Sequence, residues 1–365
     1  MNQLNKDHAM IVRTQQPLNM GTPLHLLAAQ RLTPTPLFFV RNHAPIPIID
    51  PNTYRLTVDG LVDTALSLSL NDLRTRFESH RRVEATLQCA GNRRTELIAR
   101  APIPDELPWD TDAIGTATWE GVRLRDVLEA AGIKDSAGHI AFVGLDQVVK
   151  QDKAFGFGGS IPLDKALSDE VLLVHTMNGE PLPMEHGYPL RVLVPGYIGA
   201  RSVKWLSRIT IQAEPSDNYY QAHAYKLFPP SVDERSVDWS GGVMLDHLNV
   251  NAVIFTPMHD ETLRAGKTRI SGYALTGHGR QLTQVCVSAD GGARWHTITL
   301  EPRPAQEVWS WLFWETDLDL PTGSHEIVAY AVDSAGDQQP SEVDAIWNFK
   351  GYMNNVWHRV PVQCT

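Results

Sequence analysis

The stretch from Val83 to Arg94, VEATLQCAGNRR, holds the side chains in this chain that are best suited to chemistry. Its first six residues alternate between apolar and polar, which predicts a strand. Cys89 comes next, in a turn that the following glycine and asparagine favour because both tolerate positive φ. Arg93 and Arg94 then place two cations beside the thiol, and nearby cations favour the thiolate, which is the form that binds metals. A buried structural cysteine is the commoner alternative, but arginines rarely adjoin an inert core position.

The chain's other cysteines, Cys286 and Cys364, are expected to be structural. The first lies in an alternating segment and the second near a terminus that we expect to be frayed, and neither has cationic neighbours. The three cysteines form no CxxC pair, zinc-binding spacing or CxxCH haem attachment motif. A disulfide framework is therefore not expected, which fits a reducing compartment.

The composition is that of an ordinary globular protein, and a length of 365 residues predicts two domains. With a net charge of −10 and no basic cluster, the sequence gives little support to nucleic-acid binding. It shows no apolar leader, no SKL-type end and no apolar run of the roughly eighteen residues that a membrane helix needs. We therefore expect a cytoplasmic protein without a membrane or nucleic-acid partner, in which any anion site is a local cationic pocket.

Short strands with few helices must position the cysteine stretch within residues 1–235. Because βαβ units do not repeat, the pattern predicts an α+β domain rather than a doubly wound sheet. Helices are expected at Leu24–Arg31, Ser69–Phe77 and Leu124–Ala131. Strands are expected at Leu37–Val40, Tyr54–Val58, Val83–Gln88, Gly115–Trp119, His139–Leu145, Val171–Met177, Arg191–Gly196 (with its turn) and Ser202–Ile211.

Residues 236–365 differ in character and predict an all-β domain. Apolar or alternating segments are separated by turn signals such as Asp290-Gly291-Gly292, and no helical pattern interrupts them. This arrangement is typical of an immunoglobulin-like sandwich. The expected strands are Val250–Phe255, Thr268–Tyr273, Leu282–Ser288, Trp295–Leu300, Val308–Trp314 and His325–Val332.

Cys89-Ala90-Gly91-Asn92-Arg93-Arg94 resembles the cysteine loop of the sulfite oxidase family of molybdenum enzymes. Five further segments resemble motifs of that family, in the same order: Phe39–His43, Glu185–Arg191, Gly199–Trp205, Ala224–Lys226 and Trp347–Val360. One such motif is a weak signal, whereas six in order over nearly the whole chain are a strong one. The resemblance implies a molybdopterin-binding domain over residues 1–235, followed by an immunoglobulin-like dimerisation domain over residues 236–365.

The resemblance also implies roles for individual residues. Cys89 would be the protein ligand to a molybdenum held by a pterin dithiolene, and molybdenum accepts soft sulfur donors. Cationic side chains and backbone N–H groups would bind the pterin phosphate, and guanidinium forks would bind an oxyanion substrate. The implied catalytic residues are Arg41, Arg94, Trp109, Tyr225 and Lys350. The implied cofactor-binding residues are Phe39, Val40, Asn42, His43, Asp146, His186, Arg191, Ser202, Val203 and Lys204.

Taken singly, several of these residues have a plainer interpretation. Arg41 alone would more often be a solvated loop charge, and His43 and His186 would more often be structural histidines. Trp109 could be plain core packing. Tyr225 competes with two tyrosines shortly before it, and is preferred because only it is followed by lysine.

Two positions depart from the family's pattern. Lys350 stands where sulfite-oxidising members usually have Arg and nitrate-reducing relatives usually have Met. Lysine keeps the charge but loses the bidentate fork, which predicts altered anion specificity. Ala224 stands where animal and plant enzymes commonly have an acidic residue, so the hydrogen bonds around Tyr225 are expected to differ.

The activity that the resemblance implies is molybdenum-dependent oxidation of sulfite to sulfate by oxygen-atom transfer. No haem is expected, so electrons would pass to an external acceptor, either oxygen or a cytochrome. A homodimer is expected, and Trp309, Trp311 and Trp314 would supply either its apolar interface or the sandwich core. Two alternatives remain open: reduction of nitrate or of an S- or N-oxide at the same centre, and a non-catalytic binding protein built on the immunoglobulin-like module.

Overall fold

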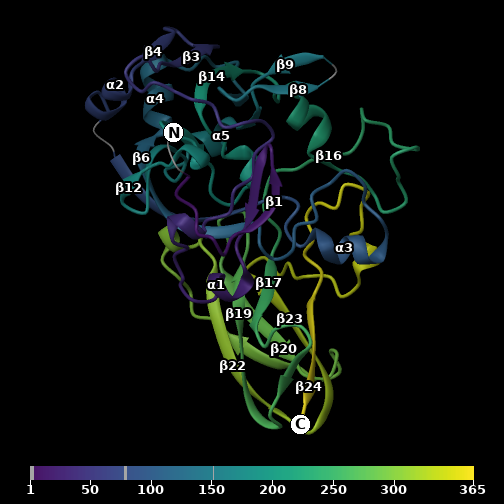
Figure 1. Ribbon diagram of the computed structural model, residues 1–365. Coiled ribbons are helices and arrows are strands. Elements are labelled where there is room, and N and C mark those ends of the chain that lie inside the picture. Colours follow the sequence, from purple (N-terminus) through teal and green to yellow (C-terminus); the bar gives the residue numbers. More distant parts are fainter. Residues whose placement is uncertain (1–3, 78–79, 151) are drawn as a thin grey trace.

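The computed structural model describes residues 4–77, 80–150 and 152–365. Figure 1 shows two lobes, an upper one built mainly from the purple to teal part of the chain and a tapering lower one of green to yellow strands. One hydrophobic cluster runs through both, because it joins Phe142 of the first lobe to Phe255, Tyr273 and Trp311 of the second. The lobes therefore share a buried core.

The first lobe contains two main β-sheets. One sheet has the order β10-β7-β14-β3-β4, in which β14 runs parallel to β3 and the other neighbours are antiparallel. Another has the order β12-β11-β6-β5, with β13 paired to β11. Their bounds are β3 (Leu56–Gly60), β4 (Leu66–Leu68), β5 (His80–Gln88), β6 (Ile114–Arg123), β7 (His139–Gly144), β10 (Gly158–Pro162), β11 (Leu172–Met177), β12 (Glu180–Pro181), β13 (Arg191–Leu193) and β14 (Leu206–Gln212). Hairpins are formed by β1 (Ile11–Gln15) with β2 (Leu18–Gly21), β8 (Val148–Lys150) with β9 (Lys153–Phe155), and β15 (Lys226–Leu227) with β16 (Val243–Met244).

Short helices connect the strands of the first lobe. They are α1 (Leu24–Leu27), α2 (Leu70–Thr75), α3 (Arg94–Arg100), α4 (Leu124–Ala131) and α5 (Leu163–Ala166). A capping box between Ser69 and Asp72 starts α2, and Gly132, in the left-handed region at φ 73°, ends α4. The helix that begins at Leu24 ends at Leu27 and is shorter than predicted; a few residues on, Thr33 N–H donates to the Thr116 carbonyl of β6 (2.7 Å).

The second lobe consists of facing strands around its own apolar core. One sheet has the order β17-β19-β22 and the other β18-β24-β23-β20-β21. Their bounds are β17 (Asn251–Thr256), β18 (Glu261–Leu263), β19 (Gly266–Leu275), β20 (Leu282–Ser288), β21 (His296–Thr299), β22 (Leu312–Leu320), β23 (Gly323–Asp333) and β24 (His358–Cys364). The expected fold class, an α+β domain followed by an all-β immunoglobulin-like sandwich, is confirmed.

Two expectations about the second lobe are settled by burial. Trp311 and Trp314 are 0% and 4% exposed, so they belong to the core rather than to an apolar surface. The expectation of a frayed end at Cys364 is wrong, because this residue is fully buried in β24. Strand β24 lies inside its sheet, between β18 and β23.

Residues 347–358 leave the second lobe and return to the cysteine loop of the first. Met353 N–H donates to the Ala90 carbonyl (2.8 Å), and the Trp347 indole N–H donates to the Leu97 carbonyl (3.2 Å). Figure 1 shows this yellow segment beside α3. The domain boundary after residue 235 stays a prediction. Within the described ranges, no helix has both the length and the apolar character to cross a membrane.

Candidate active site

The cysteine loop, residues 89–94, is fixed at the end of β5. Cys89 N–H donates to the Ala113 carbonyl (2.9 Å), and the Asn92 side-chain oxygen accepts from Ala113 N–H (2.9 Å). Gly91 N–H donates to Cys89 Sγ (3.4 Å). A side chain at Gly91 would overlap the Arg94 guanidinium. The predicted turn therefore holds the thiol in one position.

Arg93 connects the two lobes. Its side chain is fully buried and pairs with both carboxylate oxygens of Glu96, each at 2.7 Å. It also donates to Asn251 Oδ1 (2.7 Å) of the second lobe and to the Val356 carbonyl (2.9 Å) of the returning segment 347–358. The first of the two arginines is thus a structural residue.

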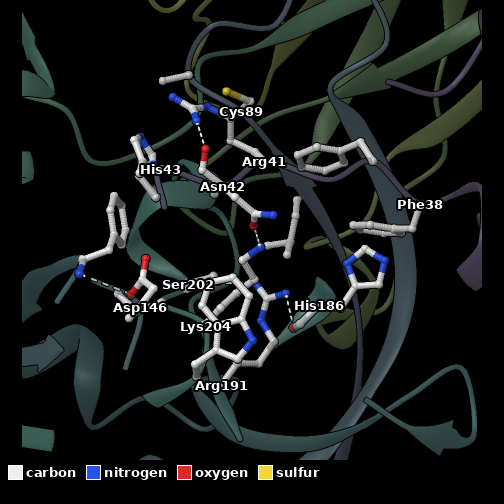
Figure 2. Close-up of a pocket in the computed structure, with 18 of the residues that line it drawn as sticks. Phe38, Arg41, Asn42, His43, Cys89, Asp146, His186, Arg191, Ser202 and Lys204 are labelled. Atoms are coloured by element: carbon white, nitrogen blue, oxygen red, sulfur yellow. Dashed lines mark hydrogen bonds between the residues drawn. The ribbon is translucent and has the colours of Figure 1, made fainter. Parts of the chain in front are cut away.

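A cavity opens beside Cys89. In the view of Figure 2, Cys89 and Arg41 lie at the top, and Arg191 and Lys204 lie at the bottom. The predicted residues that line the cavity are Phe39, Arg41, Asn42, His43, Cys89, Asp146, His186, Arg191, Ser202, Val203, Lys204 and Tyr225. Segments far apart in the sequence are therefore brought together around one space.

Arg41, His43 and Tyr225 form a buried cluster at the cysteine end. Tyr225 Oη lies 3.0 Å from His43 Nε2, and the imidazole stacks on Phe157 with the ring centroids 4.5 Å apart. Burial, reinforced by the charge of Arg41, holds the pKa of His43 well below its usual range, so the ring is neutral. Burial also raises the pKa of Tyr225, so its hydroxyl stays protonated.

Arg191 and Lys204 supply buried positive charge at the other end. Burial lowers the pKa of Arg191 to about 9, and burial together with the Arg191 charge lowers that of Lys204 well below its usual range. Arg191 donates to the carbonyls of His186 (3.0 Å) and Ser202 (2.8 Å), but its Nε has no hydrogen-bond partner among the described residues. Because buried donors are nearly always paired, this donor set suits an anionic ligand that brings its own acceptors.

Lys6, in the N-terminal segment, contacts His186 at this end of the cavity but does not itself line it. Its Nζ donates to the carbonyls of Thr35 (2.9 Å) and Phe38 (2.8 Å) and contacts His186 Nε2 (2.5 Å). Burial, against the attraction of Glu185, lowers the pKa of Lys6 to about 7. Burial, with the charge of Lys6, also keeps His186 neutral by holding its pKa well below the usual range. No pattern in the sequence marks this lysine.

The remaining predicted residues of the cavity wall are Asp146, Ser202 and Val203, and the first two accept hydrogen bonds from backbone amides. Asp146 Oδ1 accepts from Phe157 N–H (3.2 Å), and burial raises the pKa of the Asp146 carboxyl. Ser202 Oγ accepts from Val194 N–H (3.0 Å). Val203 contributes an apolar surface that is 1% exposed. These contacts shape the wall, and the proposed cofactor roles of the three residues stay predictions.

Val40 and Trp109 are close to the cavity wall but not part of it. Val40 is fully buried and pairs its backbone with Met20. Trp109 is fully buried in the cluster that contains Cys89, and its indole N–H has no partner among the described residues. A catalytic role for Trp109 and a cofactor role for Val40 stay predictions.

Arg94 and Lys350 also lie outside the cavity wall, and both pair with one carboxylate. Arg94 Nη2 is 3.5 Å from Glu106 Oε2, and Lys350 Nζ contacts Glu106 Oε1. The Arg94 guanidinium lies over the ring of Tyr352, 5.2 Å from its centroid. No sequence motif marks Glu106, because its loop resembles none of the family's segments.

Seven further residues line the cavity that were not predicted individually. Leu87 and Ala90 flank the cysteine, and Phe157 belongs to the Gly-rich segment Phe155–Gly159, whose pattern could have drawn attention to it. The remaining ones are Phe38, Gly199, Ala200 and Trp205. Most of them adjoin or fall within the motifs already noted, so the motifs located the wall more completely than the individual residues did.

Comparison with known proteins identifies the class of enzyme. Residues 43–220 match the family model of the oxidoreductase molybdopterin binding domain, and residues 243–365 match that of the Mo-co oxidoreductase dimerisation domain. Every lining residue from His43 to Trp205 falls within the first matched range. The protein is therefore a molybdopterin oxidoreductase, and a non-catalytic binding protein is excluded.

Individual relatives narrow the class to a family. Human mitochondrial sulfite oxidase is 44% identical over 97% of this chain, which spans 66% of that protein's length. Sulfite oxidase of Arabidopsis thaliana is 38% identical over 96% of this chain and is 92% covered. The solved structure of the sulfane dehydrogenase SoxCD from Paracoccus pantotrophus matches with a TM-score of 0.79 at 27% identity, covering 96% of this chain and 85% of that one. The chain belongs to the sulfite oxidase family of molybdopterin oxidoreductases.

Proposed function

We propose that this protein oxidises sulfite to sulfate by oxygen-atom transfer. The observation that carries the proposal is the arrangement of one buried cavity, with Cys89 and Arg41 at one end and Arg191 and Lys204 at the other. The first end suits a metal and a small oxyanion. The second end suits the phosphate of an anionic cofactor.

The donor set fits the molybdenum cofactor. The Cys89 thiolate would hold the metal, because molybdenum accepts soft sulfur ligands. His186, Arg191 and Lys204 would hold the pterin and its phosphate, and the unpaired Arg191 Nε supports this because it offers a buried donor. When bound, the cofactor supplies the oxygen atom that is transferred and takes up two electrons.

The chain's own residues bind and orient the substrate. The Arg41 guanidinium would hold the oxyanion by charge, and its fixed position in a buried site makes that attraction stronger than in water. The neutral ring of His43 keeps the Tyr225 hydroxyl in place, 3.0 Å away. Because burial keeps this hydroxyl protonated, Tyr225 would act as a hydrogen-bonding group and not as a second anion.

An optical titration tests the proposal. The oxidised protein is expected to show a visible thiolate-to-molybdenum band that bleaches on stoichiometric sulfite under anaerobic conditions. Cys89→Ser should lose the band and the turnover while remaining folded, and Cys286→Ser, at a buried cysteine of β20 that does not line the cavity, should keep both. A band that persists after sulfite would argue for another substrate, and turnover by Cys89→Ser would refute the ligand assignment.

The alternative, reduction of nitrate or of an S- or N-oxide, has one observation in its favour. The Lys350 ammonium, which would add a cation for sulfite, is engaged by Glu106. A substrate of lower charge would need less of this cation. Reoxidation of the chemically reduced protein by nitrate or dimethyl sulfoxide, without bleaching by sulfite, would support this alternative.

The partners complete the proposal. Residues 236–365 would form a homodimer, supported by the match to a dimerisation domain, and sedimentation analysis would give the oligomer size. The protein would work without haem and pass its electrons to oxygen or to a cytochrome. A cytoplasmic location and the absence of nucleic-acid partners stay predictions.

A further inference from the structure

Glu106 pairs with both Arg94 and Lys350, the two cations outside the cavity wall that were expected to bind the substrate. It lies in the loop between α3 and β6, and its side chain is 15% exposed. One carboxylate oxygen contacts Lys350 Nζ, and the other is 3.5 Å from Arg94 Nη2. The carboxylate therefore stands between the two positive groups.

The other two nitrogens of the Arg94 guanidinium, Nε and Nη1, already donate hydrogen bonds to backbone carbonyls. Its Nε donates to the carbonyls of Lys350 (3.2 Å) and Gly351 (3.1 Å), and its Nη1 donates to the Leu107 carbonyl (2.7 Å). Only 3% of the Arg94 side chain is exposed. Nη2 is thus the nitrogen through which Arg94 could bind an anion, and Glu106 is its neighbour.

This ion cluster adjoins the cavity through one aromatic layer. The ring of Tyr352 lies under the Arg94 guanidinium and stacks on Tyr225, with the ring centroids 5.2 Å apart. Tyr225 in turn lines the cavity. The charge of Glu106 reaches across this layer: after burial, it is among the groups that raise the pKa of Tyr225.

We propose that Glu106 is a specificity-determining carboxylate: by pairing with Lys350 and Arg94, it offsets the positive charge that these two residues present, across the aromatic layer, to a substrate oxyanion in the cavity. This inference rests on the proposed function, because it assumes an anionic substrate in the same cavity. With Glu106 in place, two cations and one carboxylate leave a single positive charge, which attracts a dianion less than a pair of free cations does.

Offsetting this positive charge has a consequence for product release during turnover. Binding substrate and product equally tightly does not speed a reaction, and a dianionic product such as sulfate leaves slowly from a site with excess positive charge. A carboxylate that stays paired with Lys350 and Arg94 reduces this excess charge and so lowers the affinity for sulfate. Glu106 therefore sets the balance between capture of the substrate and release of the product.

The test is a calorimetric titration of the holoenzyme with inorganic sulfate. Glu106→Gln, which keeps the shape and removes the charge, should bind sulfate about tenfold more tightly than the unaltered protein. Asp105→Asn is the matched control, because Asp105 is adjacent, equally charged in sign and exposed. Equal sulfate affinity in Glu106→Gln and the unaltered protein would overturn the proposal.

A double-mutant cycle with Lys350→Met removes the ambiguity of a single variant. Lys350→Met should weaken sulfate binding strongly in the Glu106→Gln background and only slightly when Glu106 is present. Equal effects in both backgrounds would also overturn the proposal. Glu106→Ala replaces Glu106→Gln in the cycle if the latter does not fold.

The sulfite KM separates this proposal from the proposed function. If sulfite is the substrate, Glu106→Gln should lower its KM together with the sulfate dissociation constant. Tighter sulfate binding in a protein that never oxidises sulfite would support the role of Glu106 and refute the proposed function. Normal sulfite turnover with unchanged sulfate binding in Glu106→Gln would support the proposed function and refute the role of Glu106.

Discussion

Burial decides the protonation of the residues around the cavity. It keeps His43 and His186 neutral and lowers the pKa values of Lys6, Arg191 and Lys204. A neutral imidazole can accept a hydrogen bond, which is how His186 meets the amine of Lys6. The wall therefore suits an anionic ligand, whose charge would raise the pKa of the cations that it meets.

Among individual residues, Lys6 gives the clearest prediction of how the free energy of unfolding depends on pH. Its pKa is about 7 in the folded protein, whereas the unfolded chain keeps the ordinary value of 10.5. Between these values only the unfolded state holds the proton, so this group's contribution to the free energy of unfolding rises with pH. From pH 7 to pH 9, we expect the wild-type free energy of unfolding to rise by roughly 2 kcal/mol relative to that of Lys6→Met.

Denaturant titrations at the two pH values check this expectation. Lys134→Met, at an exposed lysine, is the control and should follow the wild type. Parallel behaviour of the wild type and Lys6→Met would show that the amine of Lys6 keeps its proton in the folded state.

Which site residues could be predicted depended on how they are arranged in the sequence. Cys89, Arg41 and Arg191 fall in short motifs, and the structure brings all three to one cavity. Lys6 and Glu106 lie in segments of ordinary composition, and only tertiary packing brings them to His186 and Lys350. The placement of such residues depends on the fold and cannot be predicted from a local sequence pattern.

Among the elements, the ones with regular patterns were predicted and the irregular ones were missed. The alternation of β5 and β20 and the capped helices α2 and α4 agree with the structure. Helix α3 was missed because it starts directly from the cysteine turn, at Arg93 with φ 64°, and leads into a Pro-rich loop. Strand β24 was missed because Pro361 interrupts its pattern, although its partners β18 and β23 hold it inside the sheet.

The capping box of α2 gives a prediction about the stability of this helix. Ser69→Ala removes the side-chain acceptor for Asp72 N–H and should weaken the helix by about 1 kcal/mol. Hydrogen exchange of the α2 amides should accelerate about fivefold relative to Ser67→Ala, which alters an exposed serine of β4. Unchanged exchange would mean that tertiary packing alone holds α2.

At the scale of the whole molecule, Arg93 joins the two lobes. Its substitution by Met would leave the Glu96 carboxylate and Asn251 Oδ1 without their buried donor. We expect a loss of about 3 kcal/mol in the free energy of unfolding and, in scanning calorimetry, separate transitions for the lobes. Arg100→Met, which breaks only an exposed pair with Asp344, should leave one transition near the wild-type temperature.

The return of residues 347–358 to the cysteine loop has a consequence for how the protein is made. The contact between Arg93 and Val356 spans 263 positions, and β24, just beyond it, lies inside its sheet. A ribosome therefore releases Cys89 long before the segment that covers its loop has been synthesised. During that interval the nascent first lobe has its thiol and cations without these contacts, so the cysteine loop receives its final support only after translation ends.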